Sequence, residues 1–223
     1  MQIFDTPGTI SAVLDIPAGR IRFIATDRAD TVVEVLPADA SKRRDVQAAE
    51  KTEVAYSDGV LRIAAPEAKN QLLGDSGSVE VTVQLPVGSR VETKTASAEF
   101  QGVGRLGDVD FEGAQGTVEL DETASARLAL AAGDVSVRRL GGPARISTQK
   151  GDIRITEAVT GTVTLSTEHG AISVGAAREV SASLDARTSY GRIHNSLTNT
   201  EGDAAGLNIH ATTSYGDITA RGL

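Results

Sequence analysis

The stretch Thr148-Gln149-Lys150-Gly151-Asp152-Ile153-Arg154-Ile155 decides the fold, because variants of it return through the second half of the chain. A threonine, a polar or aromatic residue, a glycine and an isoleucine recur in the same order in residues 167–172, 188–193 and 213–218. The anchor positions 98, 116, 133, 151, 170, 191 and 216 are separated by 18, 17, 18, 19, 21 and 25 residues. A motif that recurs with a period near twenty residues predicts a repeat architecture.

Each repeat contains two short runs of alternating side chains on either side of the glycine. Ala144 and Ile146 share a face before the glycine, and Ile153 and Ile155 share a face after it. Alternation with a period of two is typical of a strand that is buried on one side. Each repeat is therefore expected to supply two strands with a bend between them.

The length of the repeat limits the way in which it can fold. Eighteen extended residues span at most about 60 Å, which is too little for a strand, a crossover helix and a return strand. One coil per repeat, with equivalent strands stacked in parallel about 4.8 Å apart, satisfies this limit. Since parallel crossovers are nearly always right-handed, the sequence predicts an all-β fold, a single-stranded right-handed β-solenoid with 17–25 residues per coil.

We expect one elongated domain over residues 1–223, with less regular coils and a cap in 1–88 and regular repeats in 89–223. Aliphatic residues two and four places after each anchor should stack as ladders inside the coils: Val135, Ile153, Ile172, Ile193 and Ile218, then Val137, Ile155 and Val174. The composition suits a narrow core, since aromatic residues make up only 3% of the chain, tryptophan is absent and there are 23 glycines.

The first third of the chain is predicted to hold strands as well. They are expected over residues 10–16, 20–25, 31–36, 53–56, 60–63 and 79–85, with a turn at 17–19. Asp58-Gly59 is a strong hairpin signal between two of them. Residues 39–51 predict a short surface helix or a mobile loop, and Leu72 and Leu73 in the following loop should cover the solenoid end or contact a partner.

Charge and cysteine content exclude several classes of function. With 22 basic and 30 acidic residues the formal net charge is −8, so we expect no nucleic-acid partner, because phosphate contacts need a basic surface. The absence of cysteine excludes disulfides, thiolate metal sites and a cysteine nucleophile. The sequence shows neither a signal peptide nor a run of eighteen apolar residues, which predicts a cytoplasmic protein without direct membrane insertion.

The residues that precede the repeat glycines are the candidate site. Lys150, His169, Tyr190 and Tyr215 occupy this position, so they should form a column near the bend that could bind a sugar, a peptide or a protein partner. Repeat register alone also produces such columns, and that simpler interpretation stays open. The threonines three places before the glycines are expected to form hydrogen bonds at the corner.

Motifs for other chemistry are weak or absent, so we predict no catalytic, cofactor-binding or metal-binding residues. Asp134 and Asp152 follow successive glycines and could share a cation such as calcium, but this reading is not favoured. Residues 102–107 match the dinucleotide fingerprint literally, yet the alternation after them indicates a strand where that motif needs a helix. The chain has no phosphate-binding P-loop, no His-Glu-x-x-His motif and no nucleophile elbow.

The recurring Thr-x-x-Gly-Asp-Ile pattern at Gly133, Gly151, Gly191 and Gly216, and the strand before it at 79–86, resemble a bacterial family of β-strand-repeat proteins of unknown function. Its members are described as putative adhesins, and the unit is also called the Toastrack domain. The resemblance covers residues 9–221 and implies a single-stranded β-helix used as an assembly or interaction scaffold, in some members linked to envelope-stress systems. It implies no catalytic residues.

These observations favour a non-enzymatic scaffold or protein-interaction module without a cofactor. A protein partner, or self-association, would use a face or an end of the solenoid. The alternative is a carbohydrate-binding or carbohydrate-cleaving β-helix that uses the column of Lys150, His169, Tyr190 and Tyr215. The polar insertion at 199–206 lengthens the last repeat, and we expect the coil after it to be the open end of the stack, covered by the insertion, a second copy or a partner.

Overall fold

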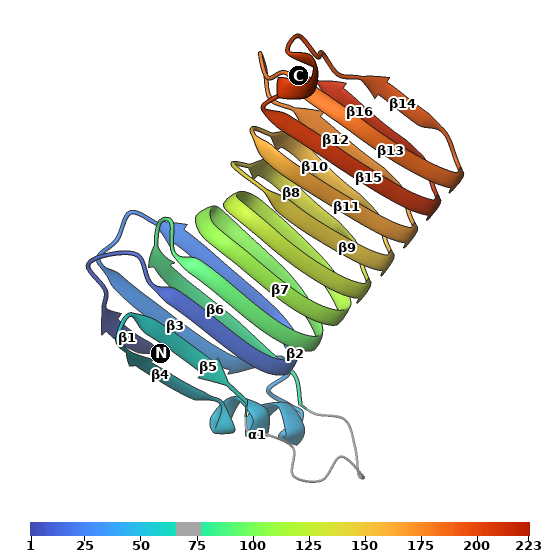
Figure 1. Cartoon of the computed structure of the whole chain (residues 1–223). Coiled ribbons are helices and arrows are strands. Elements are labelled where there is room, and N and C mark those ends of the chain that lie inside the picture. The colour runs from blue at the N-terminus through green and yellow to red at the C-terminus, as the bar shows by residue number, and fades with distance from the viewer. Residues whose placement is uncertain (66–76) are drawn as a thin grey trace. The chain divides into compact units, whose positions relative to one another are not determined.

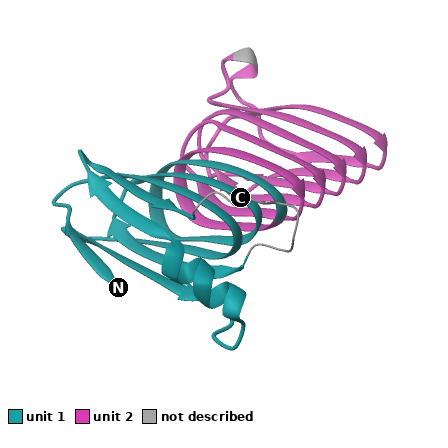
Figure 2. Cartoon of the chain, turned by 90° about the horizontal axis from the view of Figure 1, so that it is seen from below, with its two compact units in different colours: residues 1–115 teal, residues 116–223 magenta. Residues whose placement is uncertain are grey.

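A computed structural model describes residues 1–65 and 77–223 of the chain. These residues form mostly β-strand, and their strands join in one mixed and largely parallel sheet. The chain divides into two compact units, residues 1–115 and 116–223, which Figure 2 shows in different colours. The prediction of a single elongated domain stays a prediction, and the two units are described in turn.

Unit 1 contains all the strands that the sequence predicts for it. Its elements are β1 (Gln2–Asp5), β2 (Ser11–Thr26), β3 (Asp30–Pro37), α1 (Arg43–Lys51), β4 (Glu53–Ser57), β5 (Val60–Ala64), β6 (Val79–Pro86) and the first part of β7 (Arg90–Ala132). The turn predicted at residues 17–19 lies inside β2, because the strand changes its partner there without ending. Its residues before the bend pair with β5, and those from Gly19 onward pair with β6. Leu72 and Leu73 lie outside the described residues.

Pairing in unit 1 is mixed. β1, β3 and β6 are antiparallel neighbours, whereas β2 is parallel to β6, β5 and β7. β4 and β5 form the predicted hairpin, in which Asp58 and Gly59 have positive φ angles of 51° and 76°. Two consecutive positive φ angles are characteristic of a type I′ turn, which explains the Asp-Gly pair.

The core of unit 1 is built around three phenylalanines. Phe23, Phe100 and Phe111 are fully buried, with ring centroids 5.7 Å and 5.2 Å apart along the series. The charge-rich segment forms the helix α1, which packs on β3 and β6. Its buried Asp45 accepts a hydrogen bond from Ser78 N at 2.9 Å, so this carboxylate anchors the helix to the start of β6.

Unit 2 is made of two parallel ladders of short strands, labelled in Figure 1. One ladder runs through the end of β7, β9 (Ala144–Lys150), β11 (Gly161–His169), β15 (Leu207–Tyr215) and β13 (Ala182–Tyr190). The other runs through residues 118–123 of β7, β8 (Val135–Leu140), β10 (Ile153–Ala158), β12 (Ile172–Ala176), β16 (Ile218–Gly222) and β14 (Ile193–Ser196). A short 3₁₀ turn (Gly202–Ala204) lies between β14 and β15.

The register within the ladders follows the repeat. Ile153 pairs with Val135 on one side and with Ile172 on the other, and all three are buried. Equivalent positions of successive repeats therefore stack in parallel, as the period of the sequence predicts. Val135, Ile153, Ile172 and Ile218, each two places after a repeat glycine, are all 1% exposed and belong to the apolar interior of the unit.

The order of the strands in space differs from their order in the chain at one place. The last repeat, β15 and β16, lies between β11 and β13 in one ladder and between β12 and β14 in the other. The prediction that the last coil is the open end of the stack is therefore wrong, since that coil is enclosed on both sides. For the same reason Ile193 on β14 is 46% exposed, whereas the interior ladder predicted it to be buried.

Candidate functional site

The corner of each repeat in unit 2 is formed by a stack of glycines. A Cβ atom added to Gly151 would lie 2.0 Å from the carbonyl oxygen of Gly133, and one added to Gly170 would lie 2.0 Å from that of Gly151. The same separation relates Gly216 to Gly170. A carbonyl oxygen at this distance leaves no room for a side chain, which explains why glycine recurs between the two strands of a repeat.

Threonine hydroxyls bridge neighbouring repeats at the same corner. Thr167 Oγ1 donates to Gly151 O, Thr213 Oγ1 to Gly170 O and Thr188 Oγ1 to Gly216 O, each at 3.0 Å. The prediction that these threonines form hydrogen bonds at the corner is confirmed.

The aspartates that follow the glycines also connect one repeat to the next. Asp134 Oδ1 accepts from Asp152 N at 2.8 Å, and Asp152 Oδ1 accepts from Ala171 N at 2.7 Å. These two oxygens therefore bind backbone N–H groups. Among the side chains that the structure describes, no group of three or more histidine, aspartate or glutamate residues is arranged to hold a metal ion.

The four candidate residues lie side by side outside this corner. Lys150 pairs in register with His169, His169 with Tyr215, and Tyr215 with Tyr190. The rings of His169 and Tyr215 stack with centroids 5.0 Å apart at 10°, and those of Tyr215 and Tyr190 stack 4.9 Å apart at 4°. We call these four residues the corner column. Its geometry is as the sequence predicts, and its role as a ligand or partner surface stays a prediction.

Stacking determines which parts of the corner column a ligand could reach. The face of Tyr215 on either side is covered by a neighbouring ring, so mainly the ring edges of the column point to solvent. A sugar that binds an aromatic side chain needs an open ring face. Two ring faces of the column lack a ring partner in the part of the chain that the structure describes: the outer face of Tyr190, which is 67% exposed, and the face of His169 toward Lys150. This arrangement does not favour the carbohydrate alternative.

An ion pair lies beside the outer end of the corner column. Arg192 donates to Asp217 twice, through its backbone N at 2.8 Å and through Nη2 at 3.0 Å. The hydrogen bond from the Arg192 backbone and then that from its guanidinium hold the pKa of Asp217 below its usual value. The carboxylate thus ties β14 to β16 in its ionised form.

The strands β13 and β14 form what we call the edge coil. In the described part of the chain β13 pairs with β15 alone and β14 with β16 alone. Leu184, Ala186 and Thr188 of β13 are only half-buried, although their register partners on β15 are fully buried. The edge coil therefore exposes backbone and apolar side chains that every inner coil covers.

Sequence reasoning missed the edge coil, because the repeat motif is the same in all coils. The available signal was the last step between anchors, which is 25 residues long. Its additional loop leads the chain back to the position between β11 and β13, where β15 lies. Part of that loop lies at the start of β13, where Thr200 N and Glu201 N each donate to Ser181 Oγ at 3.1 Å. The insertion predicted to cover the open end thus covers only one end of this strand.

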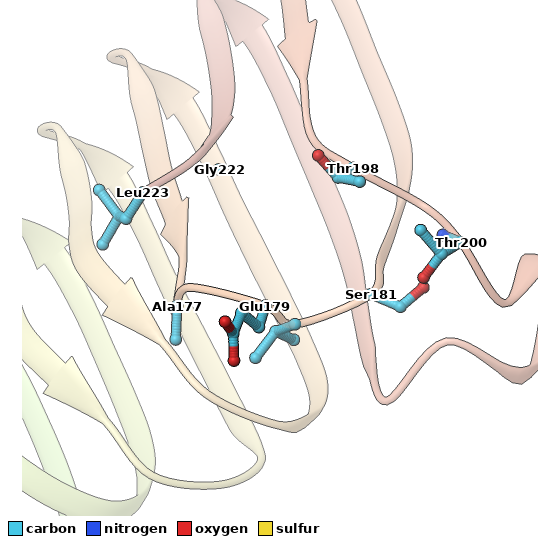
Figure 3. A pocket seen from close by; sticks show the side chains of 8 residues that line it. Ala177, Glu179, Ser181, Thr198, Thr200, Gly222 and Leu223 are labelled. Atoms are coloured by element: carbon cyan, nitrogen blue, oxygen red, sulfur yellow. The ribbon is translucent and has the colours of Figure 1, made fainter.

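A shallow depression of about 160 Å³ lies between the connection from β12 to β13 and the end of β16 (Figure 3). It is lined by Ala177, Glu179, Ser181, Thr198, Thr200 and Leu223, among others. Glu179 has a positive φ of 63° in this connection, and Leu223 N donates to Ala176 O at 3.1 Å. The depression lies near the end of β16, the strand between β12 and β14. Its lining contains one carboxylate side chain together with hydroxyl and methyl groups.

Two further expectations concern other ligands. Residues 102–107 lie within the strand β7, so the glycine fingerprint lacks the helix that a dinucleotide site requires. Over residues 1–65 and 77–223, the structure contains no helix of the length and apolar character needed to cross a membrane.

The fold and the corner define a β-strand repeat protein whose repeated residues connect neighbouring strands of a largely parallel sheet. The chain belongs to the Toastrack DUF4097 family, whose sequence pattern matches residues 72–221. The resemblance stated from the repeat motif is thereby confirmed. No curated protein matches the chain.

Several solved structures are similar to the chain. A protein described as a putative adhesin from Parabacteroides distasonis is 15% identical, with 100% of this chain and 95% of the other covered and a TM-score of 0.48. A protein described as a putative lipid binding protein from the same organism is 13% identical, with 98% and 95% covered and a TM-score of 0.49. A protein described as a putative cell adhesion protein from Clostridium sporogenes is 12% identical, with 100% and 98% covered and a TM-score of 0.41.

Proposed function

We propose that the chain is a non-enzymatic interaction module that binds a protein partner at the edge coil. The observation that carries this proposal is the single-sided pairing of β13 and β14, which leaves Tyr190 67% and Ile193 46% exposed. An unpaired strand edge is a template for another strand, and main-chain hydrogen bonds supply affinity in such complexes. The family resemblance stated from the repeat motif implies an interaction scaffold, which is consistent with a binding role.

The proposal includes the finer description of the fold. We infer that each repeat of unit 2 closes one coil of a right-handed β-solenoid, with the two ladders as its two walls. The parallel register of equivalent residues and the burial of both sets of inward side chains support this. A stack of coils needs a cover at its end, and the edge coil has only a partial one. The link to envelope-stress systems stays an expectation from the family resemblance.

Site-specific photo-crosslinking in the cells of origin tests the proposal. A photoreactive residue at Ile193 lies on the edge coil, and the same residue at Arg145 lies on an exposed face of an inner strand, β9. We expect discrete protein adducts from position 193 at native expression level and none from position 145. Equal adducts from both positions, or none from position 193 in either soluble or membrane fractions, would contradict the proposed function.

A further inference from the structure

We propose that the partner is a second copy of this chain, joined edge to edge by antiparallel pairing of β13 with β13 about a two-fold axis at Ala186. This inference rests on the proposed function, because it uses the same edge coil and names its occupant. Three features of β13 support it: the direction of its free backbone groups, the order of its charges and the incomplete burial of its inner face.

Within the described part of the chain, the backbone groups of β13 that lack a strand partner point in the directions that such a pair needs. Leu207 N on β15 donates to Ser181 O at 3.3 Å, whereas Ala182 N points away from β15 and donates to Thr198 O. Backbone direction alternates with each residue of an extended strand, so Leu184, Ala186 and Thr188 direct their N–H and C=O groups to the open side. In an antiparallel pair, residues that exchange two hydrogen bonds recur at every second position. An axis at Ala186 matches all three positions.

The sequence of β13 is complementary to itself around this axis. It reads Ser183-Leu184-Asp185-Ala186-Arg187-Thr188-Ser189, so reversal places Asp185 opposite Arg187 of the second copy, and Arg187 opposite Asp185. Asp185 and Arg187 are 54% and 78% exposed and lie 3.5 Å apart as an ion pair within one chain, so both charged groups are on the outer face of β13 and within reach of a second strand. Positions between the hydrogen-bonded pairs bring side chains closest together, and opposite charges directly across two strands stabilise the pair.

The inner face of β13 lacks one layer of side chains. Ile209, Ala211 and Thr213 on β15 are each no more than 2% exposed, because strands cover them on both sides. Their register partners on β13 are the half-buried Leu184, Ala186 and Thr188. In the proposed pair Leu184 lies across from Thr188 and Ala186 across from its own copy. The second strand therefore supplies the missing neighbours.

The two-fold geometry makes a sharp covalent test possible, since the chain contains no cysteine. In Ala186→Cys the two new thiols sit at a hydrogen-bonded pair, where Cα atoms are about 5.5 Å apart, within the range of about 4.4–6.8 Å that a disulfide requires. In the control Leu184→Cys the thiols are offset by four residues, or about 13 Å along the strands. We expect mild oxidation to give a covalent dimer of the first variant only. Equal cross-linking of both variants would overturn the proposed register.

Charge reversal tests the same pairing without a covalent bond. Asp185→Arg and Arg187→Asp each place like charges opposite one another twice, so each alone should raise the dimer dissociation constant by at least about tenfold. Mixing the two variants restores opposite charges at both positions, and a heterodimer should recover the wild-type dissociation constant. Arg145→Asp carries the same change of charge as Arg187→Asp on an inner strand of the same ladder and should leave the dimer unchanged.

Sedimentation analysis over a range of concentrations, with circular dichroism as the check of folding, measures these outcomes. A dimer that either reversal weakens and the mixture restores supports the proposal. A wild-type chain that stays monomeric, a dimer insensitive to both reversals, or a mixture that fails to recover overturns it. A monomer whose position 193 still crosslinks to a different protein would overturn self-pairing and leave the proposed function standing. A monomer without adducts would overturn both.

Discussion

Replacement of Gly151 by alanine should show how strongly the corner glycines determine the fold. The added Cβ would lie 2.0 Å from Gly133 O and 2.5 Å from Gly133 C. Both atoms belong to the backbone of the neighbouring coil and are held by the ladder hydrogen bonds, so they cannot move aside as a flexible side chain would. Gly151 also has a φ of +146°, a conformation that residues with a side chain rarely adopt.

The cost of Gly151→Ala follows from these two effects. A backbone held in a sparsely populated region costs about 1–3 kcal/mol, and a forced contact in a packed structure costs about 1–3 kcal/mol more. We therefore expect the free energy of unfolding to fall by roughly 2–6 kcal/mol. For a chain of this size, a change in the middle of that range lowers Tm by roughly 10 °C. Valine at the same position should cost more than alanine.

Thermal and urea unfolding followed by circular dichroism measure this loss. Gly206→Ala is the matched control in the same unit, because an added Cβ there meets no atom within 4 Å. Its stability should remain within about 0.5 kcal/mol of wild type. If Gly151→Ala melted together with wild type and with this control, close approach of the coils would not be the reason why glycine recurs.

Two further predictions concern the interior and the edge of unit 2. Ile153→Asp buries an unpaired carboxylate and should lower the free energy of unfolding by roughly 3 kcal/mol or more. Ile193→Asp, at the equivalent position that is 46% exposed, should lower it far less. Equal losses of stability in urea unfolding would show that the two positions do not differ in environment. Because Arg192 lowers the pKa of Asp217 in the folded state, ionised Asp217 stabilises the fold above the ordinary aspartate pKa of about 4, and this contribution is lost as pH falls through the lowered value. Asp217→Asn should therefore flatten the acid side of the stability profile, and an unchanged profile would show that this ion pair does not contribute.

The repeat made much of unit 2 predictable. Because equivalent positions of parallel coils must stack, the spacing of the glycines placed Lys150 beside His169 and gave the threonines their structural role. The ladder of Ile153 and Ile172 followed from alternation alone. Each of these features depends on local pattern and on register, which a sequence displays directly.

The order of the last two coils could not be predicted in the same way. The strands that end at Tyr190 and Tyr215 carry the same motif. The local pattern therefore does not distinguish which of them, β13 or β15, pairs with β11. The order of the two strands depends on their connections. The chain turns before β13 through Glu179, which has a positive φ, and the longer loop before β15 brings that strand between β11 and β13. The partners of Asp134 and Asp152 were equally hidden, since each carboxylate binds a backbone N–H group in the next coil.

The insertion of β15 between β11 and β13 has a consequence for synthesis of the chain. A ribosome makes β13 before β15, so during that interval β13 has no strand to pair with on the side that β15 later occupies. β15 pairs with both β11 and β13, which precede it in the chain, so these pairings form only after residues 207–215 have been made, and contacts at long sequence separation slow folding. If translation stalls before residue 207, β11 and β13 lack the strand that lies between them in the folded chain, and unpaired strand edges promote aggregation.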